Sequence, residues 1–143
     1  KRTAPDGSIL SVVPDKLWLI DYAYTDLAQM IWDTASAGRP CFMTESDSFV
    51  SLVAVYPEVS AKSRGGAQLR IPNSTNLPKG TLLDVYGVGG VETELFDKTS
   101  VDEGFLAKIG VAAVSEDGAT IETQGDGLPF LTWIGFKVQA ASR

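Results

Sequence analysis

Histidine is absent from the 143-residue chain, and cysteine occurs once, at Cys41. Without histidine the chain lacks the commonest general base and the commonest transition-metal ligand of proteins, so Ser-His-Asp and Cys-His catalytic arrangements are excluded. A single cysteine forms no internal disulfide, and we expect Cys41 to be a small buried hydrophobic side chain. Nucleotide-binding glycine motifs and Cys-x-x-Cys pairs are missing as well. We therefore expect no enzymatic activity, no cofactor and no metal ligands.

Positive charge is also scarce. Twelve lysines and arginines face 18 aspartates and glutamates, which gives a net charge of −6. The basic residues are scattered along the chain, so no basic patch offsets the average repulsion of a phosphate backbone, and we expect no nucleic-acid partner. No apolar run approaches the roughly 20 residues that span a bilayer, so we expect no membrane insertion by this segment.

The chain does contain short apolar runs, bounded by glycine, proline, asparagine or aspartate and spaced about ten residues apart. This spacing predicts an all-β fold, an antiparallel β-sandwich of about eight strands. Hydrophobic residues make up 44% of the chain, enough for one core, so residues 1–143 are expected to form a single module. The chain begins with Lys1 rather than Met, and we expect the module to be excised from a larger chain. The predicted strands cover residues 9–13, 17–20, 41–43, 49–56, 67–71, 82–86, 105–115, 119–123 and 130–138.

Four local expectations follow from the pattern. A short helix or helical turn is predicted near Asp26–Asp33, because apolar residues recur there at helical spacing. Phe49–Tyr56 is rich in β-branched and aromatic residues and predicts a central strand that Pro57 ends. Asp117-Gly118 predicts a tight hairpin turn. Trp133 is expected to lie buried between the sheets, against the Phe49–Tyr56 strand.

Exposed aromatic residues are the candidate ligand contacts. Trp32 and the pair Tyr22 and Tyr24 are the candidates for a face on which a sugar ring stacks, and for Trp32 a structural role is the favoured alternative. Oxygen-bearing side chains in two loops, Glu45–Asp47 and Glu92–Glu103, suit a calcium ion by type, but neither loop has the spacing of an EF-hand. A pair of carboxylates, with Asp84 as one member, is the only catalytic arrangement that the composition leaves open.

Four motifs carry a family resemblance: G-G-A-Q-L-R-I-P-N at Gly65–Asn73, L-P-K-G-T-L-L-D-V-Y at Leu77–Tyr86, V-S-E-D-G-A-T-I at Val114–Ile121 and G-L-P-F-L-T-W at Gly127–Trp133. With these motifs the chain resembles a bacterial extracellular β-sandwich module related to ZU5-type domains. The resemblance covers about the C-terminal half of the chain. Some ZU5-type domains cleave themselves at a His-Phe-Ser sequence, but this chain has Pro129-Phe130-Leu131 there, so that activity is not implied. The acidic stretch Gly87–Gly104 also departs from the pattern. The matching residues are Leu69, Ile71, Pro72, Asn73, Leu77, Pro78, Gly80, Thr81, Asp84, Val85, Val114, Ser115, Asp117, Gly118, Gly127, Leu128, Pro129 and Trp133.

Together, the missing catalytic chemistry, the strand pattern and the resemblance predict a non-catalytic structural or protein-interaction module of a larger secreted or cell-surface protein. Its expected partners are neighbouring domains or another protein, and its expected location is extracellular, at the cell surface or periplasmic. A carbohydrate-binding module, with or without help from calcium, is the alternative, and an enzyme that uses carboxylates is the third reading.

Overall fold

One antiparallel sheet contains every strand of the described residues, which are 1–18, 27–44 and 46–140 of a computed structural model. The strands run in the order β1-β2-β6-β9-β8-β7-β10-β5-β3, and β4 pairs with β5 beside β3. Their bounds are β1 (Arg2–Thr3), β2 (Ile9–Val12), β3 (Leu17–Trp18), β4 (Ala28–Ile31), β5 (Ser51–Ala61), β6 (Ala67–Pro72), β7 (Leu82–Val88), β8 (Leu106–Val114), β9 (Thr120–Thr123) and β10 (Phe130–Val138). The predicted all-β, antiparallel fold is confirmed.

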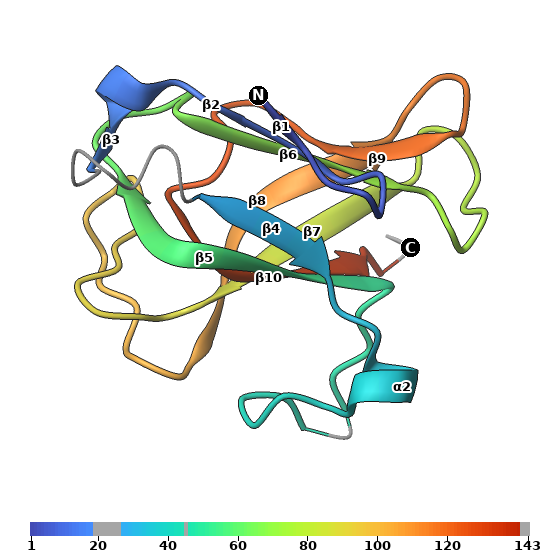
Figure 1. Ribbon diagram of the computed structural model, residues 1–143, viewed down its shortest axis with the longest axis horizontal. Helices are drawn as coiled ribbons and strands as arrows, with labels where there is room; N and C mark the ends of the chain where they lie inside the picture. Colours follow the sequence, from blue (N-terminus) through green and yellow to red (C-terminus); the bar gives the residue numbers. More distant parts are fainter. Residues whose placement is uncertain (19–26, 45, 141–143) are drawn as a thin grey trace.

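The sheet curls so that its two ends lie opposite each other (Figure 1). Strands β2, β6 and β9 form the upper layer, strands β4, β5 and β10 form the lower layer, and β8 and β7 connect the two. Strands β7, β8 and β9 follow one another in the chain, and β10 returns to pair with β7. This is a Greek-key arrangement, which is common in β-sandwiches.

The space between the layers is filled by a single cluster of buried apolar side chains. Residues from the upper layer, such as Leu10, Leu69 and Ile121, are less than 2% exposed, as are Ile134 and Phe136 from the lower layer. In the upper layer these residues alternate along their strands with more exposed ones, since successive side chains of a strand point to opposite faces. Burial of this inner face is the main favourable contribution to folding.

Two of the sequence motifs have a clear structural role at the β8–β9 end. Asp117-Gly118 forms the predicted hairpin turn, with Gly118 at φ 72° and Val114 paired with Ile121. The Asp117 carboxylate accepts hydrogen bonds from the Ser115 hydroxyl and the Ala119 amide. Asn73 ties the loop after β6 to this hairpin, because its side-chain amide donates to the carbonyls of Leu77 and Gly118.

The predicted helix near Asp26–Asp33 is displaced. Ala28–Ile31 is strand β4, and the helical turn α2 follows it at Thr34–Ala37, with Asp33 as the N-cap that accepts from the Ala35 amide. The helical preference of this segment is overridden because the edge of β5 offers backbone partners from Val53 to Tyr56. Within the described residues, the one other helical element is the 3-10 turn η1 (Pro14–Lys16).

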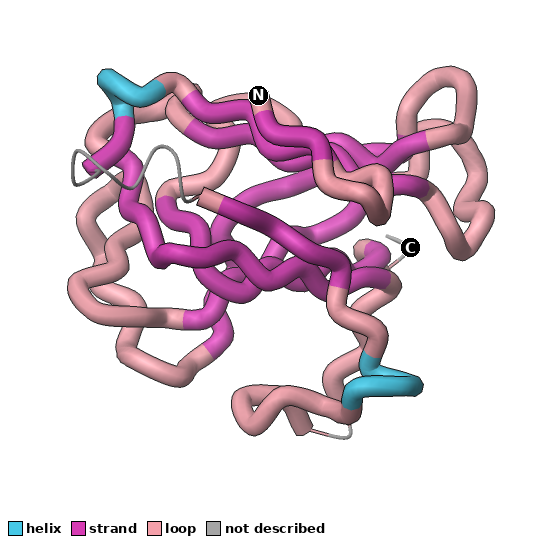
Figure 2. The backbone as a smooth tube through the Cα atoms, in the orientation of Figure 1, coloured by secondary structure: helices cyan, strands magenta, loops and turns pink. Residues whose placement is uncertain are grey.

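Three further expectations are wrong in detail. Pro57 does not end β5, which continues to Ala61. The β5–β10 register shifts between Leu131, opposite Val59, and Trp133, opposite Ala54, so Pro57 lies at a bulge, where proline is tolerated. Cys41–Met43 is a turn rather than a strand, and Cys41 is exposed rather than buried. These residues belong to the β4–β5 connection, which lies below the lower layer (Figure 2).

The chain's first residues hold the curled sheet closed beside β4. The side-chain amide of Gln29 donates to the carbonyls of Arg2 and Ser8, at 2.9 Å and 3.3 Å. In the opposite direction, the Ile31 amide donates to the Asp6 carboxylate at 2.6 Å. These hydrogen bonds link strand β4 of the lower layer to the β1–β2 hairpin of the upper layer.

Within residues 1–18, 27–44 and 46–140, no helix has the length and apolar character needed to cross a bilayer.

Candidate functional site

Of the three aromatic residues predicted as ligand contacts, Trp32 is the one that lies within the described residues. Tyr22 and Tyr24 lie outside the described residues. Trp32 is half-buried: its ring meets Trp133 edge to face, with 5.2 Å between the ring centroids, and its indole N–H donates to the Gly38 carbonyl at 2.9 Å. Part of the Trp32 ring is therefore used inside the protein, and its role as a sugar contact stays a prediction.

Trp133 is not between the layers, contrary to the sequence-based expectation. It pairs with Ala54 on β5, and its ring contacts Trp32 and Phe42, the latter at 5.4 Å. Neighbouring Ile134 is fully buried in the core. Because successive residues of a strand point to opposite faces, Trp133 lies on the outer face of the lower layer, where the β4–β5 connection packs over it.

Next to this cluster, the lower layer presents an exposed apolar surface, which we call the aromatic face. It consists of Ala28 and Met30 of β4, Ala54 and Tyr56 of β5, and Trp133 of β10. Met30 is opposite Ala54, which is opposite Trp133, and Ala28 is opposite Tyr56, so the five side chains share one face. Tyr56 is 76% exposed and Met30 is 51% exposed. The helical interpretation of residues 26–33 concealed this surface, since it did not place Met30 beside β5.

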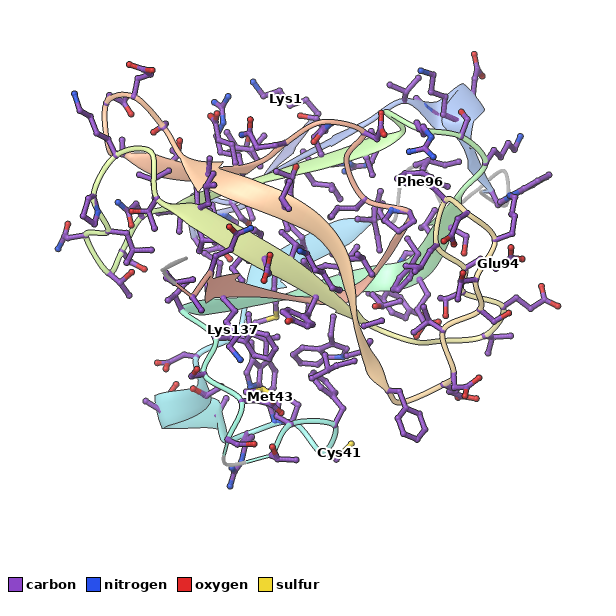
Figure 3. All side chains as sticks on the ribbon, turned by 180° about the vertical axis from the view of Figure 1, so that it is seen from behind. Lys1, Cys41, Met43, Glu94, Phe96 and Lys137 are labelled. Carbon is purple, nitrogen blue, oxygen red and sulfur yellow. The ribbon has the colours of Figure 1, made fainter. Side chains whose placement is uncertain are left out.

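A second surface is a groove of about 1410 Å³, which we call the charged groove. One wall is formed by Lys16, Trp18 of β3 and the turn Lys62–Arg64, and the other by the acidic loop after β7, at residues 90–103. Ser60, Ala61 and Pro129 also line it. Figure 3 shows Glu94 and Phe96 on this loop, on the side of the molecule where β5 ends.

Two aromatic rings of the charged groove carry a cation over one face. The Lys62 ammonium lies 4.7 Å from the centre of the Trp18 ring, and the Arg64 guanidinium lies 5.1 Å from the centre of the Phe96 ring. Trp18 remains 66% exposed. Such contacts are stabilised by the ring quadrupole, and they fix the two basic side chains on the rim of the groove.

The acidic loop has a defined conformation. The Thr93 hydroxyl is buried, donates to the Val101 carbonyl at 2.9 Å and accepts from the Gly90 amide at 3.1 Å. The Val101 side chain is part of the core cluster. The carboxylates of the loop are therefore held outward by a hydrogen-bonded backbone.

The calcium hypothesis gains no support from the described ranges, in which no group of three or more histidine, cysteine, aspartate or glutamate residues is arranged to hold a metal ion. Of the Glu45–Asp47 loop, Glu45 lies outside those ranges. The Asp47 carboxylate accepts from the Thr44 amide at 2.7 Å, as expected for an ordinary turn.

Aspartates with a shifted pKa all move in one direction. The Lys108 ammonium donates to Asp84 at 2.9 Å, and this hydrogen bond, opposed by partial burial, lowers the pKa of the Asp84 carboxyl. A general acid at neutral pH requires the opposite shift. Lowered pKa values are found for Asp6, Asp33, Asp84, Asp97 and Asp117.

Comparisons of the chain with protein-family models, with curated proteins and with solved structures find no match.

Proposed function

We propose that this chain is a non-catalytic protein-interaction module that contacts a folded partner, such as a neighbouring domain, through the aromatic face. The observation that carries the proposal is the exposure of Tyr56 and Met30, which lie diagonally across the β4–β5 pair on one sheet face. Tyrosine, tryptophan and methionine are enriched in protein interfaces, and exposed apolar patches on soluble domains mark interaction sites.

The geometry of the aromatic face suits a folded partner better than a small ligand. Its residues belong to three adjacent strands and lie in open rows rather than in a cavity. Trp133 is fixed by its contacts with Trp32 and Phe42, so a rigid aromatic ring borders the freely exposed Tyr56. Rigid aromatic residues at the centre of an interface commonly contribute most of the binding free energy.

The acid–base chemistry supports the non-catalytic part of the proposal, since the carboxyl groups with shifted pKa values are all stabilised in their ionised form. Attachment to a larger secreted or cell-surface protein, and a relationship to ZU5-type domains, remain part of the proposal on the sequence grounds given above.

The test uses a photo-reactive phenylalanine derivative, which cross-links to a bound partner on illumination. It replaces Tyr56 in one protein and Val111 in a control protein, and both are produced in the cells that make the chain. Val111 is also exposed, on β8. We expect one discrete adduct from position 56 that position 111 does not give. The captured protein is then purified, and its direct affinity is measured for the wild type and for Tyr56→Ser.

We expect Tyr56→Ser to weaken that affinity by about tenfold or more, as for a typical interface hot spot. Its stability should stay within about 0.5 kcal/mol of the wild type, because the side chain is exposed. Equal affinity of the wild type and the variant for the purified protein would refute the aromatic face as the contact surface.

Carbohydrate binding is the second candidate function, and the exposed Trp18 ring in the charged groove favours it. Tryptophan rings beside hydrogen-bonding side chains suit amphipathic ligands that have one apolar face. A linear neutral oligosaccharide is therefore included as a probe in the experiment below.

A further inference from the structure

We propose that the charged groove is a second binding site, which takes an extended polypeptide segment with alternating acidic and basic side chains. This goes beyond the interaction function proposed above, because it concerns a different surface and a different kind of partner, a linear peptide rather than a folded domain. The aromatic face belongs to β4, β5 and β10, whereas the charged groove is formed by η1, β3, the β5–β6 turn and the acidic loop.

The size of the groove favours a polymer. Pockets for small molecules usually measure about 300–1,000 Å³, whereas this groove measures about 1410 Å³ and is open to solvent. A small ligand would leave much of it filled with water. A segment of a linear polymer would contact both walls along its length.

The charges of the two walls distinguish a polypeptide from a neutral polymer. Lys16, Lys62 and Arg64 outnumber the one carboxylate on their side of the groove, Glu58 of β5, so the first wall is positive. The loop wall carries Lys98 and four carboxylates, from Glu92, Glu94, Asp102 and Glu103. Among the described residues, no ion pair joins the two walls; Arg64 pairs instead with Asp126, which does not line the groove.

Charges of opposite sign that face each other without pairing are best compensated by a ligand that brings both signs. In an extended peptide, successive side chains point to opposite sides. A peptide that lies along the groove therefore sends every second side chain to the basic wall and the others to the acidic wall. Strict alternation of acidic and basic residues matches both walls at once.

Contacts between the walls keep them in this arrangement. Arg64 of the first wall lies over Phe96 of the loop wall. Glu58 of β5 lies directly against Gly90 at the start of the loop, where a side chain at position 90 would collide with its carboxylate. The rings of Trp18 and Phe96 would pack against the aliphatic parts of lysine and glutamate side chains of the peptide.

The experiment measures binding of synthetic peptides by isothermal titration calorimetry. The main probe is a dodecapeptide of alternating glutamate and lysine, and the matched probe has the same composition in two blocks, glutamates followed by lysines. We expect the alternating peptide to bind about tenfold more tightly than the block peptide. Each block of the block peptide presents the same charge to both walls, so one wall always faces a charge of its own sign. The affinity of the alternating peptide should fall as salt is added, because the groove is solvated.

Charge-reversal variants locate the site. Lys62→Glu should weaken binding of the alternating peptide by about fivefold or more, and Glu94→Lys should do the same from the other wall. The matched controls are Lys79→Glu and Glu116→Lys, which make the same charge changes at exposed positions outside the groove. We expect the controls to change the affinity by less than about twofold.

Three outcomes of the peptide titrations would overturn the proposal. They are equal binding of the alternating and block peptides, equal loss of affinity in the groove variants and their controls, and no binding of either peptide at low salt. Binding of a linear glucan hexaose in preference to the peptides, lost in Trp18→Ala, would also overturn it and would establish the carbohydrate function instead. None of these outcomes depends on Tyr56, so failure here is distinguishable from failure of the aromatic face.

Discussion

The two faces of strand β10 use aromatic residues in opposite ways. On the inner face, Phe136 and Ile134 are fully buried in the core between the layers. On the outer face, Trp133 is only half-buried, and Gly135 leaves room for the Phe49 ring, which also lies 5.9 Å from the Tyr86 ring. The inner face therefore holds the sheet together, whereas the outer face supports the β4–β5 connection and carries the aromatic face.

The comparison is tested most strongly by Phe136→Ala. Removing a fully buried phenylalanine leaves a cavity between the layers, so we expect the free energy of unfolding to fall by about 3–5 kcal/mol. Urea denaturation followed by circular dichroism measures the change. A loss below about 1 kcal/mol would mean that the inner face is not the core.

Trp133→Ala should cost less, about 2 kcal/mol, although tryptophan is the larger residue. The substitution removes the ring contacts with Trp32 and Phe42 but exposes no part of the main core. The same denaturation experiment measures the change, and fluorescence of Trp32 should shift to longer wavelength as its neighbour is lost. If this variant proves less stable than Phe136→Ala, the assignment of the two faces is reversed.

Gly135→Ala should cost about 1–2 kcal/mol, because the new Cβ would lie 2.7 Å from the Phe49 ring and force it to move. The matched control is Gly110→Ala in β8, where the nearest side-chain atom would be 3.4 Å away. We expect the control to be neutral or slightly stabilising, since alanine reduces the entropy of the unfolded chain. Thermal unfolding compares the two, and equal melting temperatures would contradict the tight fit of Phe49.

The smallest change in the free energy of unfolding is expected at the polar end of the outer face of β10. Asp84 is opposite Lys137 of β10 and accepts hydrogen bonds from Lys108 and Gln139, and its pKa is lowered in the folded chain. A lowered folded pKa stabilises the protein above the unfolded pKa of about 3.9, and this contribution is lost as the pH falls through the folded value.

Asp84→Asn should therefore reduce stability by less than about 1 kcal/mol at neutral pH, since the pair is partly exposed. The difference between variant and wild type should disappear in acid, and urea denaturation across the acid range measures it. A difference that persists below the folded pKa would show that the carboxylate charge is not its cause.

Much of the fold could be predicted because the strands of the C-terminal half alternate regularly and are separated by turn residues. Asp117-Gly118 was sufficient to locate a hairpin, since the turn demands a residue that accepts positive φ. Strand β4 could not be predicted from Ala28–Ile31, because these residues favour helix in isolation and become a strand only beside β5. Trp133 was assigned to the wrong face because the register shift after Leu131 is not visible in the sequence.

The candidate surfaces were harder to predict than the fold. Trp32 was singled out, but the more exposed Tyr56 and Met30 were not, since their common face depends on the pairing of β4 with β5. The walls of the charged groove come from residues 16–18, 58–64 and 90–103, which are distant in sequence. The pairing of β3 with β5 and the position of β10 between β5 and β7 bring them together, so no local pattern marks the groove.

The hydrogen bond from Ile31 to Asp6 has a consequence for the behaviour of the protein in concentrated solution. Strand β4 is bonded on one side to β5, and an uncapped amide on its other side would invite a strand from a second molecule. Asp6 occupies that amide, and its negative charge repels further backbone carbonyls. We therefore expect the exposed β1–β2 turn to disfavour edge-to-edge pairing of two molecules at β4, although its residues contribute little to the core.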